Sequence, residues 1–570
     1  MWIRLVLSNS TGLLALDRIN LSSAIICWRK IMHEFFFYTL KAIKPYKNKL
    51  ITLSVCCLCT SLINLFIPLL SGDFFDKMVE TPKMNTILEF GILLFLINIV
   101  NMILNYSISI LNISIQVKSS YELNKCILEK LSKVDILELS KMNRTYLNQR
   151  INNDVNTVII FIIGLIKDII INAVTLLISF IILLKVNITT GIIFLIILLF
   201  YVALYKYIRQ IIIKLQTELL EKKSQYFSKL QDLINYIKFT KIYSYDSFLL
   251  NSLNKKYNEM YSCMIKNQKY AYSLSTSEQV ILLFSQLFLY IICGYKVIKG
   301  TLTIGIFVIM SSYFNNIVRS IKYFSSLYQQ YLSAFAGYKR LKEVEQLRKD
   351  CSGKIKMNKV DVIQLKNISY TFNEIKIFDN INLDFKKNNI YMICGRNGVG
   401  KSTIINIILG LYTSYRGRIF FDSIEARNVD LYDLRKNHIS YVDQSPILIN
   451  STVKENLCLN NIVSLTKLKK CLQGFKLIDI NDDVEKFLSK NINELNSNVS
   501  GGEAQKICII RELIRNKEIM IFDEPTSKLD SESKIYFINK IKKIKKDHII
   551  IIITHDSEMI KSIGENIIQW

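Results

Sequence analysis

Four short segments in the last third of the chain combine residue types that could act on a nucleotide phosphate. In chain order they are Gly395–Thr403, Val499–Glu503, Ile519–Glu524 and His555. A glycine-rich run lets backbone N–H groups curl around phosphate oxygens, and a lysine after it can reach the terminal phosphates. Two carboxylates at the end of an apolar strand can bind Mg²⁺ and activate water. One segment alone would be weak, but their order predicts a site that binds and hydrolyses ATP.

The glycine-rich segment has the surroundings that a phosphate loop needs. An apolar strand, Asn389–Cys394, runs into it, and a helix, Ile404–Leu411, follows it. The helix N-terminus adds a partial positive charge, Lys401 reaches the β- and γ-phosphates, and the Ser402 hydroxyl can bind Mg²⁺. The residues that we expect to bind ATP here are Gly395, Asn397, Gly398, Gly400, Lys401, Ser402 and Thr403.

The acidic pair and the late histidine supply the remaining chemistry. We expect Asp523 to bind Mg²⁺ directly or through water, and Glu524 to polarise the attacking water as general base. His555 follows a further apolar strand, Ile549–Thr554. Taken alone, it could equally be a histidine of the hydrophobic core. Together with the other three segments, it is expected to contact the γ-phosphate.

The composition predicts a membrane part in addition to this site. The chain has 570 residues, too many for one domain, and 50% of them are hydrophobic, with a mean hydropathy of +0.25. The net charge of +26 would suit nucleic acid, but the lysines are scattered among Ile and Asn instead of forming one basic face. We therefore expect no nucleic-acid partner and interpret the charge as cytoplasmic loops beside membrane lipids.

Six apolar stretches precede residue 320, and a bilayer core of about 30 Å needs roughly 20 apolar residues as helix. They are Leu50–Ser71, Ile87–Ser109, Ile169–Leu184, Ile188–Tyr205, Val280–Ile298 and Ile304–Ile317. Lys and Arg collect before the first stretch and in the long connections 110–168 and 206–275. Positive loops face the cytoplasm, so the N-terminus, both connections and everything after the sixth stretch are expected there.

The two long connections keep apolar residues at helical spacing, over Leu123–Leu131 and Leu215–Ile242. They predict helices that continue from the spans into the cytoplasm and turn back near Lys141–Tyr146 and Asp232–Tyr236. Short helices at these turns would contact a partner below the membrane. The alternative is two solvent-exposed hairpins without a partner.

A row of polar side chains follows one helical face of the second stretch. It consists of Asn98, Asn101, Asn105, Ser109 and Asn112. Amides are expensive in lipid, so this face is expected to turn inward. It could line a water-filled cavity, hydrogen-bond to a neighbouring helix, or reflect an Asn-rich composition, and the sequence leaves these alternatives open.

Residues 358–570 resemble the nucleotide-binding domain of ATP-binding cassette (ABC) transporters. The segment VSGGE at Val499–Glu503 is similar to the family's signature, usually LSGGQ. The resemblance implies that Ser500, Gly501 and Gly502 bind an ATP held by the phosphate loop of another copy of the domain. A working unit would therefore be a dimer, either of identical or of different half-transporters.

Three further positions gain roles from the same resemblance. Gln444, in Tyr441–Pro446, looks like the family's lid glutamine, which assists catalysis and binds the Mg²⁺. Ser527–Asp530 looks like the loop after the acidic pair. Phe372 stands where the family stacks an aromatic ring on adenine, with Tyr370 as the fallback for that role.

The membrane half adds to the resemblance, because six spans ahead of one ATPase domain look like an exporter half-transporter. The implied fold class is an all-α six-helix transmembrane domain followed by an α/β P-loop ATPase domain. We expect an N-terminal cytoplasmic extension (1–45), the six-span domain with long cytoplasmic helices (46–320), a helical linker (321–357) and the ABC ATPase domain (358–570).

The implied function is ATP-driven export of a peptide, a lipid or an amphipathic small molecule across the cytoplasmic membrane. One alternative is a membrane-anchored ATPase that regulates or assembles other proteins without cargo. Another is a soluble chromosome-type or translation-factor ATPase, which would require every apolar stretch to be a buried core helix.

Overall fold

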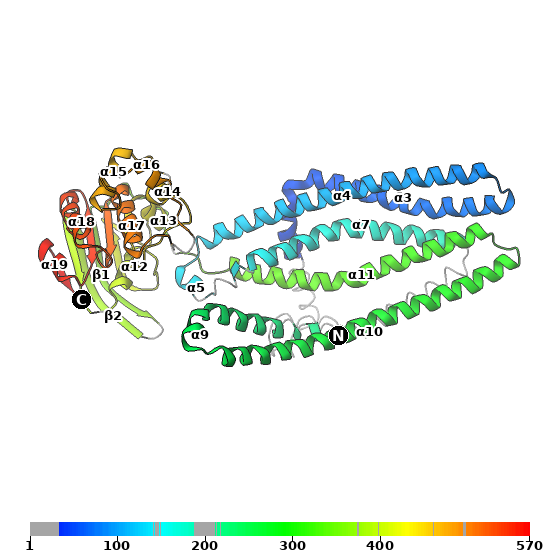
Figure 1. Ribbon diagram of the computed structural model, residues 1–570, viewed down its shortest axis with the longest axis horizontal. Helices are drawn as coiled ribbons and strands as arrows, with labels where there is room; N and C mark the ends of the chain where they lie inside the picture. The colour runs from blue at the N-terminus through cyan, green and yellow to red at the C-terminus, as the bar shows by residue number, and fades with distance from the viewer. Residues whose placement is uncertain are drawn as a thin grey trace. The chain divides into compact units, whose positions relative to one another are not determined.

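The computed structural model describes residues 33–140, 142, 147–148, 150–186, 211, 214–216, 218–219, 221–350, 352–372, 375–396, 398–459, 461–493 and 498–570. Contacts divide the chain into two units (Figure 1). An all-helical unit ends at Leu128 and resumes over Leu147–Val344, whereas Glu129–Tyr146 and Glu345–Trp570 form an α/β unit. The expected fold class is confirmed, while the domain boundaries at 45, 320 and 357 stay predictions.

The helices of the first unit are long. In chain order they are η1 (Lys44–Tyr46), α3 (Lys47–Glu80), α4 (Met84–Leu131), the π-helical turn η2 (Arg150–Asp154), α7 (Val155–Val186), α9 (Ile237–Tyr243), α10 (Asp246–Ile298) and α11 (Ile304–Glu345). At 1.5 Å per residue, the 48 residues of α4 span about 72 Å, more than twice the thickness of a bilayer core. The helices thus extend beyond a membrane, as the sequence predicts.

Five helical segments of the described residues are long and apolar enough to cross a membrane. They are His33–Glu80, Met84–Leu131, Ile151–Lys185, Ser247–Ile298 and Ile304–Phe324. These segments contain five of the six predicted stretches, and the fourth stretch, Ile188–Tyr205, lies outside the described residues.

Two glycines bring the backbones of α3 and α11 into contact. A Cβ atom added to Gly305 would lie 2.1 Å from the carbonyl oxygen of Gly72. Beside this contact, the carboxylate of Asp76 accepts hydrogen bonds from the Gly305 N–H (2.6 Å) and the Thr303 hydroxyl (2.7 Å). An anion is favourable at a helix N-terminus, so Asp76 caps α11 from α3 and fixes the two helices to each other.

A second link joins the start of α7 to the far part of α11. Arg340 donates two hydrogen bonds to Asp154, from Nε (2.8 Å) and from Nη2 (2.6 Å). The Asp154 side chain is only 10% exposed. This two-point fork sets both the distance and the orientation of the two helices.

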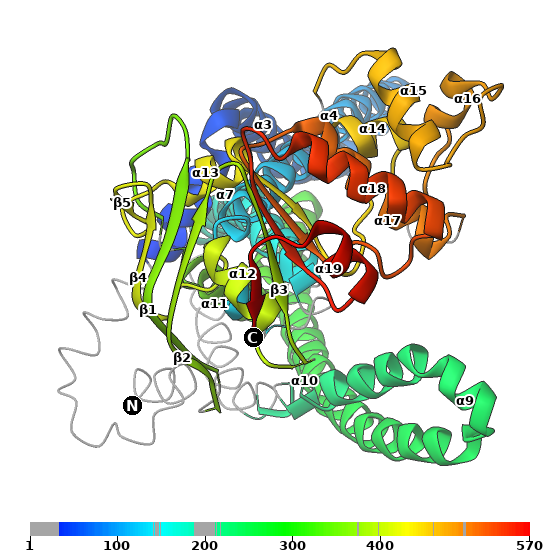
Figure 2. The same ribbon diagram turned by 90° about the vertical axis from the view of Figure 1, so that its left-hand side faces the viewer.

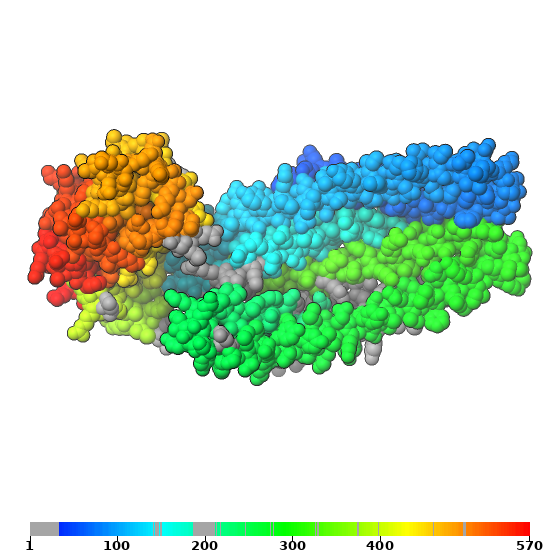
Figure 3. All heavy atoms as spheres, viewed as in Figure 1, coloured from blue at the N-terminus to red at the C-terminus, as the bar shows by residue number. Residues whose placement is uncertain are grey.

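Among the described residues, the second predicted turn carries a group of exposed apolar side chains. The helical turn breaks at Tyr236, α9 follows, and Ser244 in the left-handed conformation ends it before α10 begins. In Figures 1 and 2, α9 runs beside the first turns of α10 and away from α7 and α11, and Figure 3 shows the same segment as atoms. Side chains between 49% and 64% exposed form what we call the α9 patch: Tyr236, Ile237, Phe239, Ile242, Tyr243, Tyr245 and Phe248.

The polar row on α4 splits between two environments. Asn101 donates a hydrogen bond from Nδ2 to Asn64 Oδ1 of α3 (2.9 Å), and Asn105 donates to Asn101 Oδ1 (3.4 Å). Asn98 and Asn105 are exposed in the single chain. Helix-to-helix hydrogen bonding is therefore observed for Asn101, while the cavity hypothesis stays open for the exposed amides.

The α/β unit contains two sheets. A four-stranded antiparallel sheet has the order β2-β1-β4-β5, and a five-stranded parallel sheet has the order β6-β7-β8-β3-β9. The strands are β1 (Val362–Phe372), β2 (Ile375–Lys386), β3 (Asn389–Cys394), β4 (Arg416–Phe421), β5 (Ile424–Glu425), β6 (Ile439–Val442), β7 (Ile519–Asp523), β8 (Ile549–Ile553) and β9 (Ile567–Gln569).

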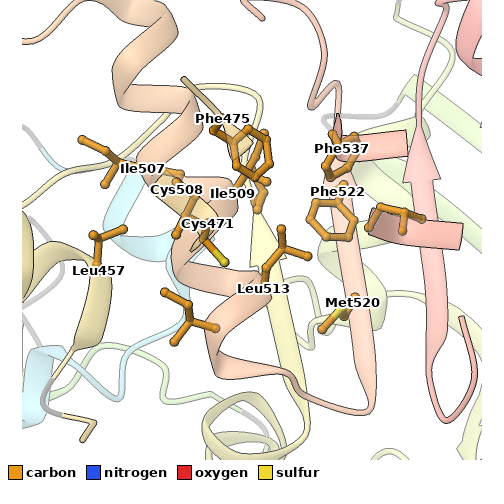
Figure 4. Packing of buried hydrophobic residues seen from close by; sticks show 14 of the residues in the cluster. Leu457, Cys471, Phe475, Ile507, Cys508, Ile509, Leu513, Met520, Phe522 and Phe537 are labelled. Atoms are coloured by element: carbon orange, nitrogen blue, oxygen red, sulfur yellow. The ribbon is translucent and has the colours of Figure 1, made fainter. Parts of the chain in front are cut away.

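The α/β unit also contains several helices. They are α12 (Lys401–Ile408), α13 (Leu431–Asn437), α14 (Val453–Cys458), α15 (Leu465–Gly474), α16 (Val484–Leu488), α17 (Gly501–Arg515), α18 (Ser531–Ile544) and α19 (Ser557–Ile563). Every residue of β7 and β8 is buried, which explains why these strands are isoleucine-rich runs without polar alternation. Figure 4 shows α17 and β7 sharing one core, in which Phe522 meets Phe537 edge to face at 5.2 Å.

The first of the two predicted turns, within Glu129–Tyr146, belongs to the α/β unit. Its short helix, α5 (Ile136–Ser140), follows Val134, which forms an isolated antiparallel bridge with Lys349. The Asp135 N–H donates to the Arg348 carbonyl (2.9 Å), and the Asp350 N–H donates to the Lys133 carbonyl (2.9 Å). A segment between α4 and α7 thus extends the packing of the α/β unit. The predicted turn at Lys141–Tyr146 lies mostly outside the described residues.

Candidate nucleotide site

The carboxyl ends of three neighbouring strands bring most of the predicted residues together. In the parallel sheet, β7, β8 and β3 lie side by side. β7 ends at Asp523, His555 follows β8, and β3 runs into Gly395. Figure 2 labels β3 and α12, which follows it in the chain. Parallel strands present all their carboxyl ends at one edge, where ligands of such sheets bind.

The lysine of the phosphate loop forms hydrogen bonds with the backbone of its own loop. Lys401 begins α12, is 7% exposed, and donates from Nζ to the carbonyl oxygens of Gly395 (2.7 Å) and Arg396 (2.8 Å). Gly398 and Gly400 have φ angles of +82° and +99°, which residues with a Cβ rarely adopt. The loop therefore has the charge and the backbone curvature that a phosphate requires.

Two other expected members of this loop differ in what is described. Thr403 is half-buried in the first turn of α12. Asn397 lies outside the described residues.

The expected Mg²⁺ ligands Ser402 and Asp523 are in direct contact. The Ser402 hydroxyl donates to Asp523 Oδ2 at 2.8 Å. Burial raises the pKa of the Asp523 carboxyl above its ordinary value, although the hydrogen bond from Ser402 opposes the shift. A hydroxyl and a buried carboxylate are oxygen ligands of the kind that Mg²⁺ prefers, so this pair fits the ion.

Two side chains orient the expected general base. Gln444 donates from Nε2 to one carboxylate oxygen of Glu524 (3.0 Å), and His555 Nδ1 lies 3.2 Å from the other. The Glu524 side chain is 13% exposed and that of His555 is 64% exposed. His555 is therefore not a core histidine in this fold. Both carboxylate oxygens of Glu524 have partners, which leaves this group held in one orientation.

Burial separates the two candidates for the adenine contact. Phe372 ends β1 with 45% of its surface exposed, so one face of its ring is open to a base. Tyr370 is 2% exposed and stacks on Tyr412 at 5.8 Å. A buried, stacked ring has no free face, and this geometry favours Phe372.

The hydrogen bonds of Ser500 in the signature segment are formed within its own helix. Ser500 caps α17: its hydroxyl accepts from the Glu503 N–H (3.1 Å), and the Glu503 carboxylate accepts from the Ser500 N–H (2.7 Å). Among the described residues, no hydrogen bond joins Ser500 to Lys401. Gly501 and Gly502 form the first turn of the same helix.

The structure adds two residues that sequence reasoning missed. Gln505 is fully buried and donates from Nε2 to the Glu524 carbonyl (2.9 Å). Trp570 donates from Nε1 to the Val399 carbonyl of the phosphate loop (2.8 Å). Gln505 occupies an apolar position of its helix, one turn before Cys508, and a polar residue there is a usable signal. For Trp570, the sequence carries no signal that we recognise.

Comparisons with known proteins agree with this fold and with an ATPase domain in the last part of the chain. Residues 378–527 match the family described as "ABC transporter", and residues 50–321 match "ABC transporter transmembrane region". An ATP-dependent lipid A-core flippase of Syntrophus aciditrophicus is 28% identical over 276 residues, 47% of this chain and 45% of that protein. A Haemophilus influenzae protein described as "Probable ABC transporter ATP-binding/permease protein" is 28% identical over 277 residues, 48% of this chain and 49% of its own length.

A solved structure gives the likeness over nearly the whole chain. A bacterial Atm1-family ABC exporter with ATP bound superimposes with a TM-score of 0.80 and 17% identity, covering 90% of this chain and 92% of the other. At that identity the likeness concerns the fold. The curated relatives are matched over half of their length or less.

Proposed function

The chain belongs to the ABC transporters, in the exporter-type arrangement that joins one membrane part to one ATPase part, and from this premise we propose that it exports a substrate by hydrolysing ATP. One observation carries the proposal. Glu524 is held at both carboxylate oxygens, by Gln444 and His555, at the sheet edge where the phosphate loop begins. A fixed carboxylate beside a phosphate loop is the arrangement that hydrolysis of a nucleoside triphosphate needs.

ATP binding would begin with Lys401. Its ammonium exchanges the carbonyl oxygens of Gly395 and Arg396 for phosphate oxygens, and the α12 N-terminus adds its dipole. Phe372 stacks on the adenine. Mg²⁺, held by Ser402, Asp523 and Gln444, would neutralise charge on the phosphates.

Hydrolysis would then depend on Glu524. Its carboxylate accepts the proton of the attacking water, while Gln444 keeps that carboxylate in place. His555 is close enough to Glu524 to hold the γ-phosphate next to the same water. This assigns general-base catalysis to one residue and orientation to two.

The proposed working unit is a dimer, identical or mixed. Ser500 would reach the γ-phosphate bound by Lys401 of the second chain, as the family's signature does, and its own hydrogen bonds here stay at the start of α17. The α9 patch supports the same conclusion, because exposed apolar surfaces of this kind mark interaction sites. We propose that a second half-transporter covers it.

Mixing two inactive variants tests the dimer. Lys401→Ala removes a phosphate ligand and Ser500→Arg blocks the signature, so each alone is expected to be inactive. A mixed dimer would contain one complete site, with Lys401 from one chain and Ser500 from the other. We expect hydrolysis to recover when the two variants are combined and to stay absent when either variant is measured alone. If co-purification shows that mixed dimers have formed and hydrolysis still does not recover, the shared site is refuted.

This is a membrane protein, and we propose that its N-terminus and ATPase unit lie in the cytoplasm, since Lys and Arg collect on that side of the spans. The cargo would be a peptide, a lipid or an amphipathic small molecule. Lipids are the first to test, because one relative is named a lipid A-core flippase.

The decisive experiment compares the wild-type chain with Glu524→Gln in lipid discs. ATP turnover is expected to fall by about 100-fold or more, with ATP affinity retained. Glu558→Gln is the matched control, because Glu558 lies on α19 with a 78% exposed side chain. Unchanged turnover in Glu524→Gln would overturn the base assignment. In vesicles, hydrolysis without vectorial movement of any screened cargo would favour the membrane-anchored regulatory ATPase instead.

A further inference from the structure

The backbone of the general base is in an unusual conformation. Glu524 has a φ angle of +47°, in the left-handed region that residues with a Cβ seldom adopt. Its N–H donates to the Ile553 carbonyl of β8 at 2.9 Å. Such a conformation persists only when the surrounding groups enforce it. Residues in conformations of this kind are often found at active sites.

One buried side-chain amide holds the carbonyl group of Glu524 and the loop that follows it. Gln505 donates from Nε2 to the Glu524 carbonyl (2.9 Å) and to the Ser527 hydroxyl (3.4 Å). Its Oε1 accepts from the Lys528 N–H (3.0 Å). A single side chain therefore joins three points of the segment 524–528, and its exposed fraction is 0%.

Gln505 stands on the helix that begins with the signature segment. Two further contacts tie that helix to the same loop. Lys506, 8% exposed, forms an ion pair with Asp530 at 2.5 Å. A Cβ atom on Gly502 would lie 2.8 Å from the Lys528 carbonyl oxygen, so the helix start and the loop are in backbone contact. The start of α17 and the loop 524–530 are packed as one piece.

We propose that Gln505 is a positioning residue that couples two ATP sites: it transmits the position of the signature segment, engaged in the partner's site, to the general base of this chain's own site. When Ser500–Gly502 bind the partner's nucleotide, the position of α17 becomes fixed. Gln505 then holds the backbone of Glu524 in the left-handed conformation that orients its carboxylate. The inference rests on the proposed function, because it needs Glu524 to act as base.

The competing explanation is that Gln505 satisfies loop hydrogen bonds and serves stability alone. A second buried amide provides the matched control. Asn456 on α14 is 0% exposed, donates from Nδ2 to the Ile449 carbonyl (2.9 Å), and accepts from the Ile449 N–H (2.8 Å). It has the same chemistry and burial, and its side chain also accepts from Arg511 of α17 (3.4 Å), but among the described residues it has no hydrogen bond to the segment 524–530.

The test measures kcat and KM for ATP of the full-length dimer in lipid discs. Gln505→Leu is expected to lower kcat by about tenfold or more and to change KM by less than about threefold. Gln505→Glu keeps the size and the acceptor for Lys528 but not the donor to Glu524, and kcat is expected to fall by at least about fivefold. Asn456→Leu is expected to lose thermal stability with kcat within about threefold of wild type.

A double mutant separates positioning from stability. In the Glu524→Gln background, adding Gln505→Leu is expected to change the residual hydrolysis by less than about twofold, because no base remains to be aimed. Loss by the same factor in both backgrounds would overturn the inference. So would kcat within about threefold of wild type for both Gln505 variants, and Gln505→Glu carries the test if Gln505→Leu does not fold.

A wrong base assignment and a wrong coupling role for Gln505 give different results. If Glu524→Gln keeps full turnover, the base assignment falls and this inference falls with it. If Glu524→Gln is inactive and the Gln505 variants are fully active, the proposed function stands and only the coupling is wrong.

Discussion

Replacing Gly305 by alanine is expected to separate α3 from α11 at their glycine contact. The new Cβ would lie 2.1 Å from the Gly72 carbonyl oxygen and 2.5 Å from Asp76 Cγ and Oδ2. The nearest of these atoms belongs to a backbone, which cannot rotate out of the way. Restoring an ordinary contact of 3.4 Å would require a shift of about 1.3 Å between the helices.

The cost has two parts. Overpacking in a closely packed region costs about 1–3 kcal/mol. The shift also lengthens the 2.6 Å hydrogen bond from the Gly305 N–H to Asp76, whose loss at a partly exposed site adds about 1 kcal/mol. We expect a total of about 3 kcal/mol, which corresponds to roughly a hundredfold change in the equilibrium between joined and separated helices.

Thermal unfolding of the chain in lipid discs, followed by loss of the folded dimer in size-exclusion chromatography, measures this effect. Gly91→Ala and Gly294→Ala are the matched controls, since a Cβ at either position meets no atom of the described residues within 4 Å. Both are expected to be neutral or to stabilise their helices by about 0.5–1 kcal/mol. If Gly305→Ala proves as stable as these controls, the proposed contact between α3 and α11 is wrong.

Three further outcomes follow from individual side chains. Burial raises the pKa of Asp523, and a proton on its carboxylate competes with Mg²⁺. The Mg²⁺ concentration for half-maximal hydrolysis should therefore rise as pH falls, starting at a pH above the ordinary aspartate pKa. A Mg²⁺ requirement that does not change with pH would contradict this. Burial alone would raise the pKa of Asp530, but hydrogen bonds from Lys506 and Ser533 hold it below its usual range. Asp530→Asn should therefore lower the free energy of unfolding by about 1 kcal/mol at neutral pH, a figure discounted for partial exposure. The difference in unfolding free energy from wild type should shrink as pH falls below the ordinary aspartate pKa. The same difference in acid as at neutral pH would refute this role of the Asp530 carboxylate. Arg340→Ala leaves Asp154 buried without its partner and should cost about 2–3 kcal/mol in thermal unfolding, whereas Arg340→Lys should recover part of this; equal losses would show that charge contributes nothing.

Strand positions could be predicted because the apolar runs are short and end at residues with chemistry. Ile519–Phe522 and Ile549–Ile553 were predicted as strands and correspond to β7 and β8. The parallel arrangement then places their carboxyl ends together, so the proximity of Glu524 and His555 follows from sequence and topology.

The conformation of the site could not be predicted in the same way. Nothing in the residue type of Glu524 indicates a positive φ angle, which depends on hydrogen bonds from β8 and from α17. Gln505 is 19 residues away in sequence from the carbonyl it holds. Contacts of that range depend on how helix and sheet pack, and a local pattern does not contain this information.

The polar segment Arg348–Asn358 also differs from a simple linker. The sequence predicts a helical linker over 321–357, but Lys349 pairs with Val134, and Asp350 forms an ion pair with Arg435 at 3.0 Å. Farther along, the Gly353 N–H donates to the Val429 carbonyl at 2.8 Å. The charged composition that indicates a free linker here supplies specific partners in the α/β unit.

The membership of Glu129–Tyr146 in the α/β unit bears on how such chains can be recombined. A chimera joined at Glu345 would keep Val134 and Asp135 from one parent and place them against Lys349 from the other parent. The exchanged module would therefore lack its own Glu129–Tyr146 segment. A transplant that moves both sequence blocks together keeps the Val134–Lys349 bridge native. The inheritable ATPase module of this protein is therefore discontinuous in the gene, and engineering it requires two crossovers more than its linear order suggests.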